Sequence, residues 1–181
     1  ETTPCNPLHA YAQSKYQAEQ ILQNLADINF QVSILRPPMI YGLNAKGNLI
    51  SLAKLVARFS ILPFGFSENK RSIVYVENLA YFIHLVAQNH KTGIFLPQDQ
   101  KPLSILEIVQ NLATVQNKKV YLFRLPQFIF SLLFFIKPQI MTRLFGTLQL
   151  NSSSSDNSLG YQALYSSQEG FRRMLSPKKS D

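Results

Sequence analysis

Tyr11-Ala12-Gln13-Ser14-Lys15 places a tyrosine and a lysine four residues apart near the start of the sequence. In a helix, side chains with this spacing lie one turn apart on the same face. That face continues as an otherwise apolar stripe through Ala18, Ile21, Leu22 and Leu25. We therefore expect a helix over residues 8–26 that directs the phenol and the ammonium toward the protein interior or a cleft wall. An ammonium beside a phenol favours the phenolate and so suits acid–base catalysis, although a chance pairing at a helix start explains the spacing as well.

Short strand-like and helix-like segments alternate after this helix. Apolar, β-prone runs predict strands over residues 30–35, 71–76, 93–96 and 120–123. Apolar periodicity and two capping boxes predict helices over residues 49–59, from Glu77, after Ser104–Glu107 and after Ser166–Glu169. Such alternation indicates an α/β protein. Two prolines should end the first strand at residues 37–38. We expect residues 39–42 to lead into a polar loop over residues 43–48, residues 62–66 to form a break and the serine-rich residues 151–158 to form a surface loop.

The composition is that of a globular protein. The chain has 181 residues, 46% hydrophobic and 15% charged, enough for one domain or part of a larger one. Its single cysteine, Cys5, cannot form an intrachain disulfide, which suggests a reducing compartment, and we expect the cytoplasm. The sequence opens on Glu1 without a start methionine, so we interpret it as a fragment.

The net charge of +8 raises the question of anionic partners. The basic residues are mostly dispersed and carry no aromatic nucleic-acid signature, so we expect no nucleic acid. A phosphate-bearing small ligand or an anionic lipid surface explains the charge as well. His9, His84 and His90 are too scattered to suggest a metal site.

Residues 125–136 form the most apolar run in the sequence. Twelve residues are too few to cross a bilayer, which takes about 20. Two interpretations stay open: a helix buried in the protein, which is the default, and peripheral contact with a membrane surface. The second would place the protein at the inner face of the membrane.

Four ordered motifs run through nearly the whole sequence. They are an acidic-Pro-x-x-x-Tyr-x-x-x-Lys-like segment at 1–15, an LRPxxxYG-like strand end at 34–42, an xxRxxVxVxDxA-like segment at 69–80 and an LGW…EEG-like element at 159–170. In this order they resemble the C-terminal part of the extended short-chain dehydrogenases/reductases, the NAD-dependent nucleotide-sugar epimerase/dehydratase group. Similarity at residues 62–79 and 146–153 points to the subgroup that serves bacterial surface polysaccharides.

The fold implied by this resemblance is the C-terminal part of a Rossmann-like NAD(P)-binding fold with a small mixed α/β substrate-binding subdomain. Residues 1–47 and 71–90 would form mainly the sheet core, residues 48–70 and 91–175 mainly the substrate subdomain, and residues 176–181 a flexible tail. The family's glycine-rich turn, Gly-x-x-Gly-x-x-Gly, does not occur in the sequence. We therefore expect the N-terminal half to be missing and this chain alone to be inactive.

The resemblance assigns catalytic and cofactor roles to three residues. Tyr11 would exchange a proton with a sugar hydroxyl or keto oxygen. Lys15 would assist Tyr11 and bind the nicotinamide ribose of NAD or NADP, so that both residues also contact the cofactor. The backbone at Pro38 would meet the nicotinamide end.

Substrate contacts are implied at three further positions. Asn48 and Leu49 would approach the diphosphate of the nucleotide sugar at a helix N-terminus, which suits anions. Arg71 would bind the same diphosphate with its guanidinium fork. A plain helix cap at Asn48 and a surface residue at Arg71 are the alternatives, and Met39 stands where some epimerases carry a substrate-binding asparagine.

The function implied is that of an NAD(P)-dependent epimerase or keto-reductase acting at C4 of a nucleotide sugar, with a UDP-sugar as the expected substrate. Surface polysaccharide biosynthesis is the expected role, and a homodimer is one possible assembly. The alternative is a catalytically incomplete fragment that acts only as a nucleotide-sugar or partner-binding module.

Overall fold

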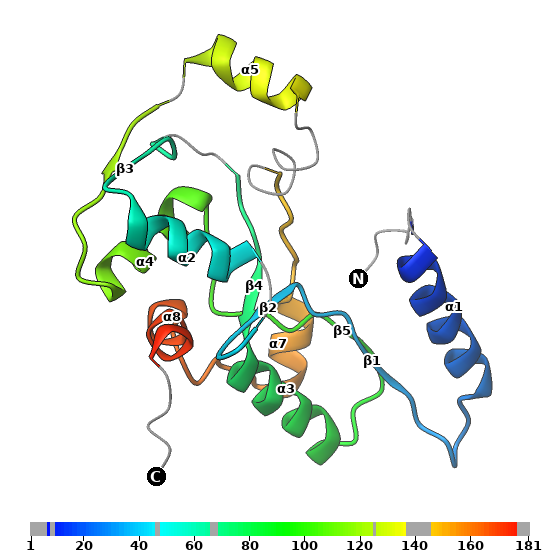
Figure 1. Ribbon diagram of the computed structural model, residues 1–181. Helices are drawn as coiled ribbons and strands as arrows, with labels where there is room; N and C mark the ends of the chain where they lie inside the picture. The colour runs from blue at the N-terminus through cyan, green and yellow to red at the C-terminus, as the bar shows by residue number, and fades with distance from the viewer. Residues whose placement is uncertain are drawn as a thin grey trace.

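The computed structural model describes residues 7, 10–45, 48–65, 69–124, 126–136 and 146–176. Its elements follow in the order α1 (Ala10–Leu25), β1 (Ser33–Leu35), β2 (Met39–Tyr41), α2 (Asn48–Arg58), β3 (Ile61–Leu62), β4 (Ile73–Tyr75), α3 (Val76–Gln88), β5 (Gly93–Phe95), α4 (Ile105–Val115), β6 (Tyr121–Leu122), α5 (Gln127–Ile136), α7 (Ser153–Leu159) and α8 (Ser167–Leu175). Figure 1 shows a body of strands and helices with α1 standing to one side.

The strand pairs of the described chain are parallel. β1 pairs with β5, β2 with β4 and β3 with β6, so each strand meets a partner far along the sequence. Parallel partners need long crossover connections, which helices commonly supply. Here α2 lies between β2 and β4, and α3 lies between β4 and β5. The arrangement confirms the predicted α/β class.

The main core lies where α2, α4 and α8 pack together over β2 and β4. The apolar stripes predicted for the first two of these helices are buried: Leu49, Leu52, Ala53 and Val56 on α2, and Ile105, Ile108, Val109 and Leu112 on α4. Burying one such side chain stabilises the fold by about 1.5–3 kcal/mol. This layer therefore anchors the segments that carry Asn48 and Arg71.

The helix predicted after Ser104 begins with a complete capping box. The Ser104 hydroxyl accepts from the Glu107 amide at 3.1 Å, and the Ser104 amide donates to the Glu107 carboxylate at 2.7 Å. The bond from the Ser104 amide to the carboxylate is the main cause that holds the pKa of Glu107 below its usual value. At the second predicted box, Ser166 caps the Glu169 amide at 3.3 Å, but the Glu169 carboxylate turns to Arg172 and Arg173 instead.

The structure contains two short strands, β2 and β3, that the sequence did not predict. β1 ends before Pro37-Pro38, as expected, but the chain then forms β2, which pairs with β4 rather than continuing along β5. Proline removes a ladder donor without preventing a new strand beyond it. β3 overlaps the expected break and pairs with β6, which lies about 60 residues further along the chain.

The predicted loop over residues 151–158 is wrong, because residues 153–159 form α7. Its serines find buried partners: Ser155 accepts from the Leu96 amide at 3.1 Å, and Ser152 accepts from the Gln98 side chain at 2.6 Å. Gly160 then ends the helix in the left-handed conformation, at φ 60°. Tertiary hydrogen bonds thus overrule the loop preference of a serine run.

The default interpretation of the apolar run at 125–136, burial in the protein, is wrong for most of the side chains that the structure describes, although Ile129 is half-buried. Phe128 is 73% exposed and Phe135 is 86% exposed on α5, which stands at one end of the molecule (Figure 1). The described elements leave these faces open. No described helix is both long and apolar enough to cross a bilayer.

The predicted division into sheet core and substrate subdomain stays a prediction. However, β5 pairs with β1, so residues 93–95 lie with the sheet rather than with the subdomain assigned from residue 91 onward. The tail from 177 to 181, Cys5 and His9 lie outside the described residues.

Candidate active site

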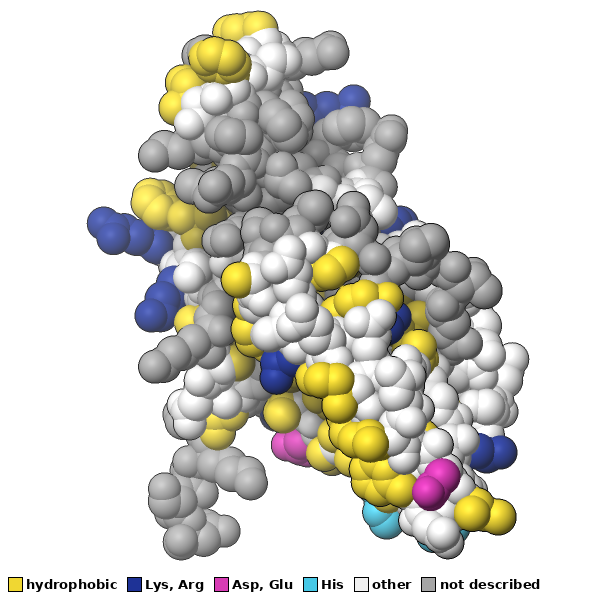
Figure 2. Space-filling view, turned by 90° about the vertical axis from the view of Figure 1, so that its right-hand side faces the viewer, with side chains coloured by type: hydrophobic (Ala, Val, Ile, Leu, Met, Phe, Trp, Pro, Cys, Tyr) yellow, Lys and Arg dark blue, Asp and Glu magenta, His cyan; other side chains and the backbone are white. Residues whose placement is uncertain are grey.

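Tyr11 and Lys15 lie together on α1, as their spacing predicts. The Lys15 ammonium nitrogen is 5.7 Å from the centre of the Tyr11 ring. The expectation that this face points into the protein is wrong for the described chain, because α1 has no buried residue and Tyr11 is 75% exposed. Figure 2 looks onto this side of the molecule and shows a band of hydrophobic side chains open to solvent. No described element packs over it.

An ion pair ties α1 to the strand beside it. The Nε of Arg36 donates to both carboxylate oxygens of Glu19, at 3.0 and 3.2 Å, and a second guanidinium nitrogen also bonds that carboxylate. Arg36 directly follows β1, and its amide donates to the carbonyl of Phe95 in β5 at 2.9 Å. The pair therefore sets the direction of the helix that carries Tyr11 against the β1–β5 sheet. Sequence reasoning missed Glu19, although it lies one turn beyond Lys15.

Pro38 lies just beyond the carboxyl end of β1 and is half-buried. Ligands of open α/β sheets bind in the crevice outside the carboxyl ends of parallel strands. β5 runs parallel to β1, so both strands end at this edge. Pro38 therefore lies where ligands usually bind in folds of this kind, and its contact with the nicotinamide stays a prediction.

Asn48 and Leu49 form the first turn of α2 but differ in what they can offer a ligand. The Asn48 side chain is exposed, whereas the Leu49 side chain is buried in the main core. Only the Leu49 amide, not its side chain, is suited to an anion at this helix start, where free N–H groups carry partial positive charge. The cavity beside them, shared with Met39 and Met174, measures about 40 Å³ and is too small for a sugar.

Arg71 is held by two other segments of the chain, one at Leu103 and one at residues 146–148. Its backbone exchanges hydrogen bonds with Leu103 at 2.8 and 2.9 Å, and it forms a parallel bridge to Leu148. Its Nε donates to the Gly146 carbonyl at 2.9 Å. Partial burial lowers the pKa of the Arg71 guanidinium, which stays charged at neutral pH. Arg71 is thus half-buried rather than exposed, and its contact with a diphosphate stays a prediction.

Asp99 is the buried centre of a hydrogen-bond network that the sequence did not reveal. This carboxylate is 2% exposed and accepts from the Tyr41 hydroxyl at 2.6 Å, the Asn78 amide group at 2.8 Å, the Tyr75 backbone at 3.0 Å and the Ser167 hydroxyl at 3.1 Å. Burial, reinforced by the charge of Asp99, raises the pKa of Tyr41. These hydrogen bonds hold β4, the strand that follows Arg71, in place.

A second polar chain lies next to Arg71. Ser72 donates to the Gln98 side chain at 2.6 Å and accepts from the Leu150 amide at 2.9 Å. Gln98 in turn donates to Ser152, which donates to Asp156. Burial raises the pKa of Asp156, whose Oδ1 atom is buried without a hydrogen-bond partner. These bonds attach the segment after residue 146 to the start of β4.

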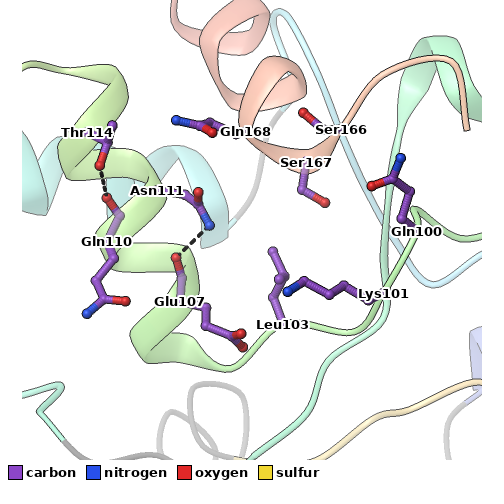
Figure 3. A pocket seen from close by; sticks show the side chains of 10 residues that line it. All are labelled: Gln100, Lys101, Leu103, Glu107, Gln110, Asn111, Thr114, Ser166, Ser167 and Gln168. Atoms are coloured by element: carbon purple, nitrogen blue, oxygen red, sulfur yellow. Dashed lines mark hydrogen bonds between the residues drawn. The ribbon is translucent and has the colours of Figure 1, made fainter.

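A polar groove of about 280 Å³ lies between α4 and α8 (Figure 3). Gln100, Lys101, Leu103, Glu107, Gln110, Asn111, Thr114, Ser166, Ser167 and Gln168 line it. Leu103 and Glu107 adjoin the Arg71 segment, the latter through an ion pair with Lys70 at 3.5 Å. None of the predicted site residues lines this groove.

The structure does not bring the predicted site together in one place. Figure 1 shows α1, with Tyr11 and Lys15, apart from α2 and from β4 with its preceding Arg71. The two halves of the site are thus separately built: a Tyr–Lys helix beside β1, and an arginine held by the polar networks of β4. Among the described residues no group of three metal-binding side chains occurs.

Solved structures share this fold. The Bordetella bronchiseptica enzyme WbmG, solved in complex with NAD and UDP, matches the chain with a TM-score of 0.67 and 19% identity, over 95% of this chain and 50% of that one. The fold is therefore of the Rossmann-like α/β class. The sequence profile of the NAD dependent epimerase/dehydratase family matches residues 1–95, and the chain belongs to this family.

Two relatives are similar in sequence. The UDP-glucose 4-epimerase of Vibrio cholerae is 36% identical over 173 residues, which cover 92% of this chain and 53% of that protein. The N-acetyl-alpha-D-glucosaminyl-diphospho-ditrans,octacis-undecaprenol 4-epimerase of Escherichia coli O157:H7 is 30% identical over 131 residues, 70% of this chain and 40% of that protein. The chain thus spans about half the length of these relatives or less.

Proposed function

We propose that this chain is the C-terminal part of an NAD(P)-dependent nucleotide-sugar 4-epimerase or 4-keto-reductase. The observation that carries the proposal is the Tyr11–Lys15 pair, one turn apart on a helix that the Glu19–Arg36 ion pair holds beside β1. The names of the two relatives support C4 as the reacting carbon. The UDP in the WbmG complex supports a UDP-sugar, and the undecaprenol-linked sugar named for the E. coli relative supports a role in surface polysaccharide synthesis.

In this reaction Tyr11 moves the proton at the sugar O4 atom. Its phenolate accepts the hydroxyl proton as the C4–H bond breaks, and the Lys15 ammonium stabilises that phenolate. NAD(P), when bound, accepts the hydride from C4 and can return it. In an epimerase the keto sugar is reduced again from its other face and Tyr11 returns the proton to O4; a reductase performs only the second half.

The described residues suit one end of that cofactor. Pro38 lies outside the carboxyl end of β1, at the edge where a nicotinamide would meet the Tyr11 helix. The sequence has no glycine-rich turn to hold the cofactor's phosphates. We propose that a segment outside this sequence supplies that turn and covers the apolar face of α1.

Arg71 would bind the substrate diphosphate, and the first turn of α2 would add backbone donors at Asn48 and Leu49. The two segments that hold Arg71 support this role, because a fixed guanidinium gives up little conformational freedom on binding. A cytoplasmic location and a homodimer stay predictions. The alternative function, a binding module without turnover, is favoured by the exposure of Tyr11 in the chain as given.

The test joins this chain to the N-terminal portion of the V. cholerae relative that the match leaves uncovered. The fusion and its Tyr11→Phe variant are incubated with NAD and UDP-glucose or UDP-N-acetylglucosamine, and the sugar products are followed by NMR. Interconversion of the C4 epimers that is lost in the variant supports the epimerase. Turnover that persists undiminished in the variant refutes the role of Tyr11, and binding of UDP without any turnover favours the binding module.

A further inference from the structure

Exposed apolar side chains gather at the end of the molecule formed by β3, β6 and α5. This patch, which we call the α5 pole, comprises Phe59, Ile61, Tyr121, Phe123, Phe128, Phe135 and Ile136. β3 pairs with β6 in the register Ile61 to Tyr121, so segments 60 residues apart contribute to one surface. Figure 1 shows α5 beyond these strands, and Figure 2 shows hydrophobic side chains at the same end.

The segments that build the α5 pole carry positive charge alone. Residues 116–136, which contain β6 and α5, have three basic residues and no Asp or Glu: Lys118, Lys119 and Arg124. Residues 50–65, which include β3, add Lys54 and Arg58, again without an acidic residue. The Arg58 guanidinium lies 5.6 Å from the centre of the Phe59 ring. Cations thus border the apolar side chains.

A helix that is apolar nearly all round is normally buried, in protein or in lipid. Ser131 is the only polar residue between Phe128 and Ile136, yet the described ends of α5 are exposed. Ten residues make a helix of about 15 Å, half the thickness of a bilayer core, so α5 can lie in a membrane interface but cannot cross it. Phenylalanine and tyrosine beside lysine and arginine suit that interface.

We propose that the α5 pole docks on the surface of a bilayer that contains anionic lipids. A second copy of the chain fits less well, because two such poles would bring like charges together. The proposal is independent of the roles of Tyr11 and Arg71, which lie on other elements. It extends the predicted membrane contact of residues 125–136 to β3, β6 and Phe59. Anionic lipids would pair with the positive charges at this end of the molecule.

The test measures flotation of the full chain with vesicles of phosphatidylcholine alone or with 30% phosphatidylglycerol. We expect binding to the anionic vesicles, weakened by 0.5 M NaCl. Each of Arg58→Gln and Lys119→Gln should weaken binding about fivefold, the contribution of one cation near an anionic surface. The matched charge control is Lys91→Gln, outside the pole, which should leave binding unchanged.

The apolar contribution is tested by the double variant Phe128→Ser/Phe135→Ser against Ile21→Ser/Leu25→Ser, which removes exposed apolar side chains from α1. We expect at least tenfold weaker vesicle binding for the first and no change for the second, with equal circular dichroism for both. Equal loss in both variants would overturn the proposal, as would failure of the parent chain to float. Light scattering that shows a lipid-free dimer abolished only by the α5 variant would assign the pole to a second copy and equally overturn it.

Discussion

The hydroxyl of Tyr41 lies 2.6 Å from Oδ2 of Asp99, a carboxylate 58 residues further along the chain. This bond joins β2 to the segment after β5, and the other three donors to Asp99 add β4, α3 and α8. A buried carboxylate is tolerated only when its oxygens are fully hydrogen-bonded. The Asp99 carboxylate therefore joins the four elements β2, β4, α3 and α8.

Replacing Asp99 with alanine should lower the free energy of unfolding strongly. Four donors, three of them from buried residues, lose their acceptor at once, and an effect of about 3–5 kcal/mol is expected. Tyr41→Phe removes one donor only and should cost about 1–2 kcal/mol. Urea denaturation followed by circular dichroism measures both values. Tyr121→Phe, at an exposed tyrosine, is the control, and a similar loss there would contradict the assignment.

Asp156 should make stability depend on pH. Burial raises its pKa from the ordinary 3.8 in the folded chain, so the ionised form is disfavoured on folding. This carboxyl therefore costs stability at neutral pH, and the cost disappears as the pH falls through the raised pKa toward 3.8. Asp156→Asn should melt higher than the parent at pH 7, and the difference should shrink toward pH 4. A difference that is constant with pH would refute this account.

The Glu19–Arg36 pair should govern how firmly α1 is held. Glu19→Gln weakens the ion pair between this helix and Arg36, the residue after β1, a partly exposed pair of about 1 kcal/mol or less. Amide hydrogen exchange over residues 10–25 should rise severalfold, while exchange in α4 stays unchanged. Gln23→Ala on the exposed surface of α1 serves as the matched control. Equal exchange in Glu19→Gln and the parent would show that the pair does not hold the helix.

Arg71 should be required for affinity toward the UDP part of the substrate. Arg71→Gln removes charge-assisted hydrogen bonds, each typically about 1.5–3 kcal/mol, so UDP binding in the fusion protein should weaken at least tenfold by calorimetry. Arg71→Lys keeps the charge without the fork and should recover only part of this loss. Lys101→Gln in the neighbouring groove is the control. Unchanged UDP affinity in Arg71→Gln would remove this residue from the site.

The buried faces of α2 and α4 could be predicted because apolar periodicity and capping residues are local signals. The buried stripe from Leu49 to Val56 and the cap at Ser104 are examples. Asp99 could not be predicted, since its partners come from residues 41, 75, 78 and 167 and no local pattern joins them. The same reason explains the missed strands β2 and β3, each of which depends on a distant partner for its ladder.

The candidate site shows a similar limit. The spacing of Tyr11 and Lys15 predicted their proximity, yet the apolar stripe could not tell whether a covering surface would be present. Arg71 was found through its place in a motif, whereas the bridge to Leu103 and the bond to Gly146 that hold it are long-range contacts. Sequence patterns thus point to candidate site residues but do not reveal the long-range contacts that hold them.

The exposed apolar stripe of α1 couples two equilibria, the covering of this helix and the withdrawal of Tyr11 and Lys15 from solvent. Ile21, Leu22 and Leu25 stand in water on the same helix as Tyr11 and Lys15. Whatever covers them would stabilise that helix by mass action and would at the same moment withdraw the phenol and the ammonium from solvent. The covering of α1 and the activation of the Tyr11–Lys15 pair would then be one thermodynamic step. The pair would be inactive until the covering part is bound.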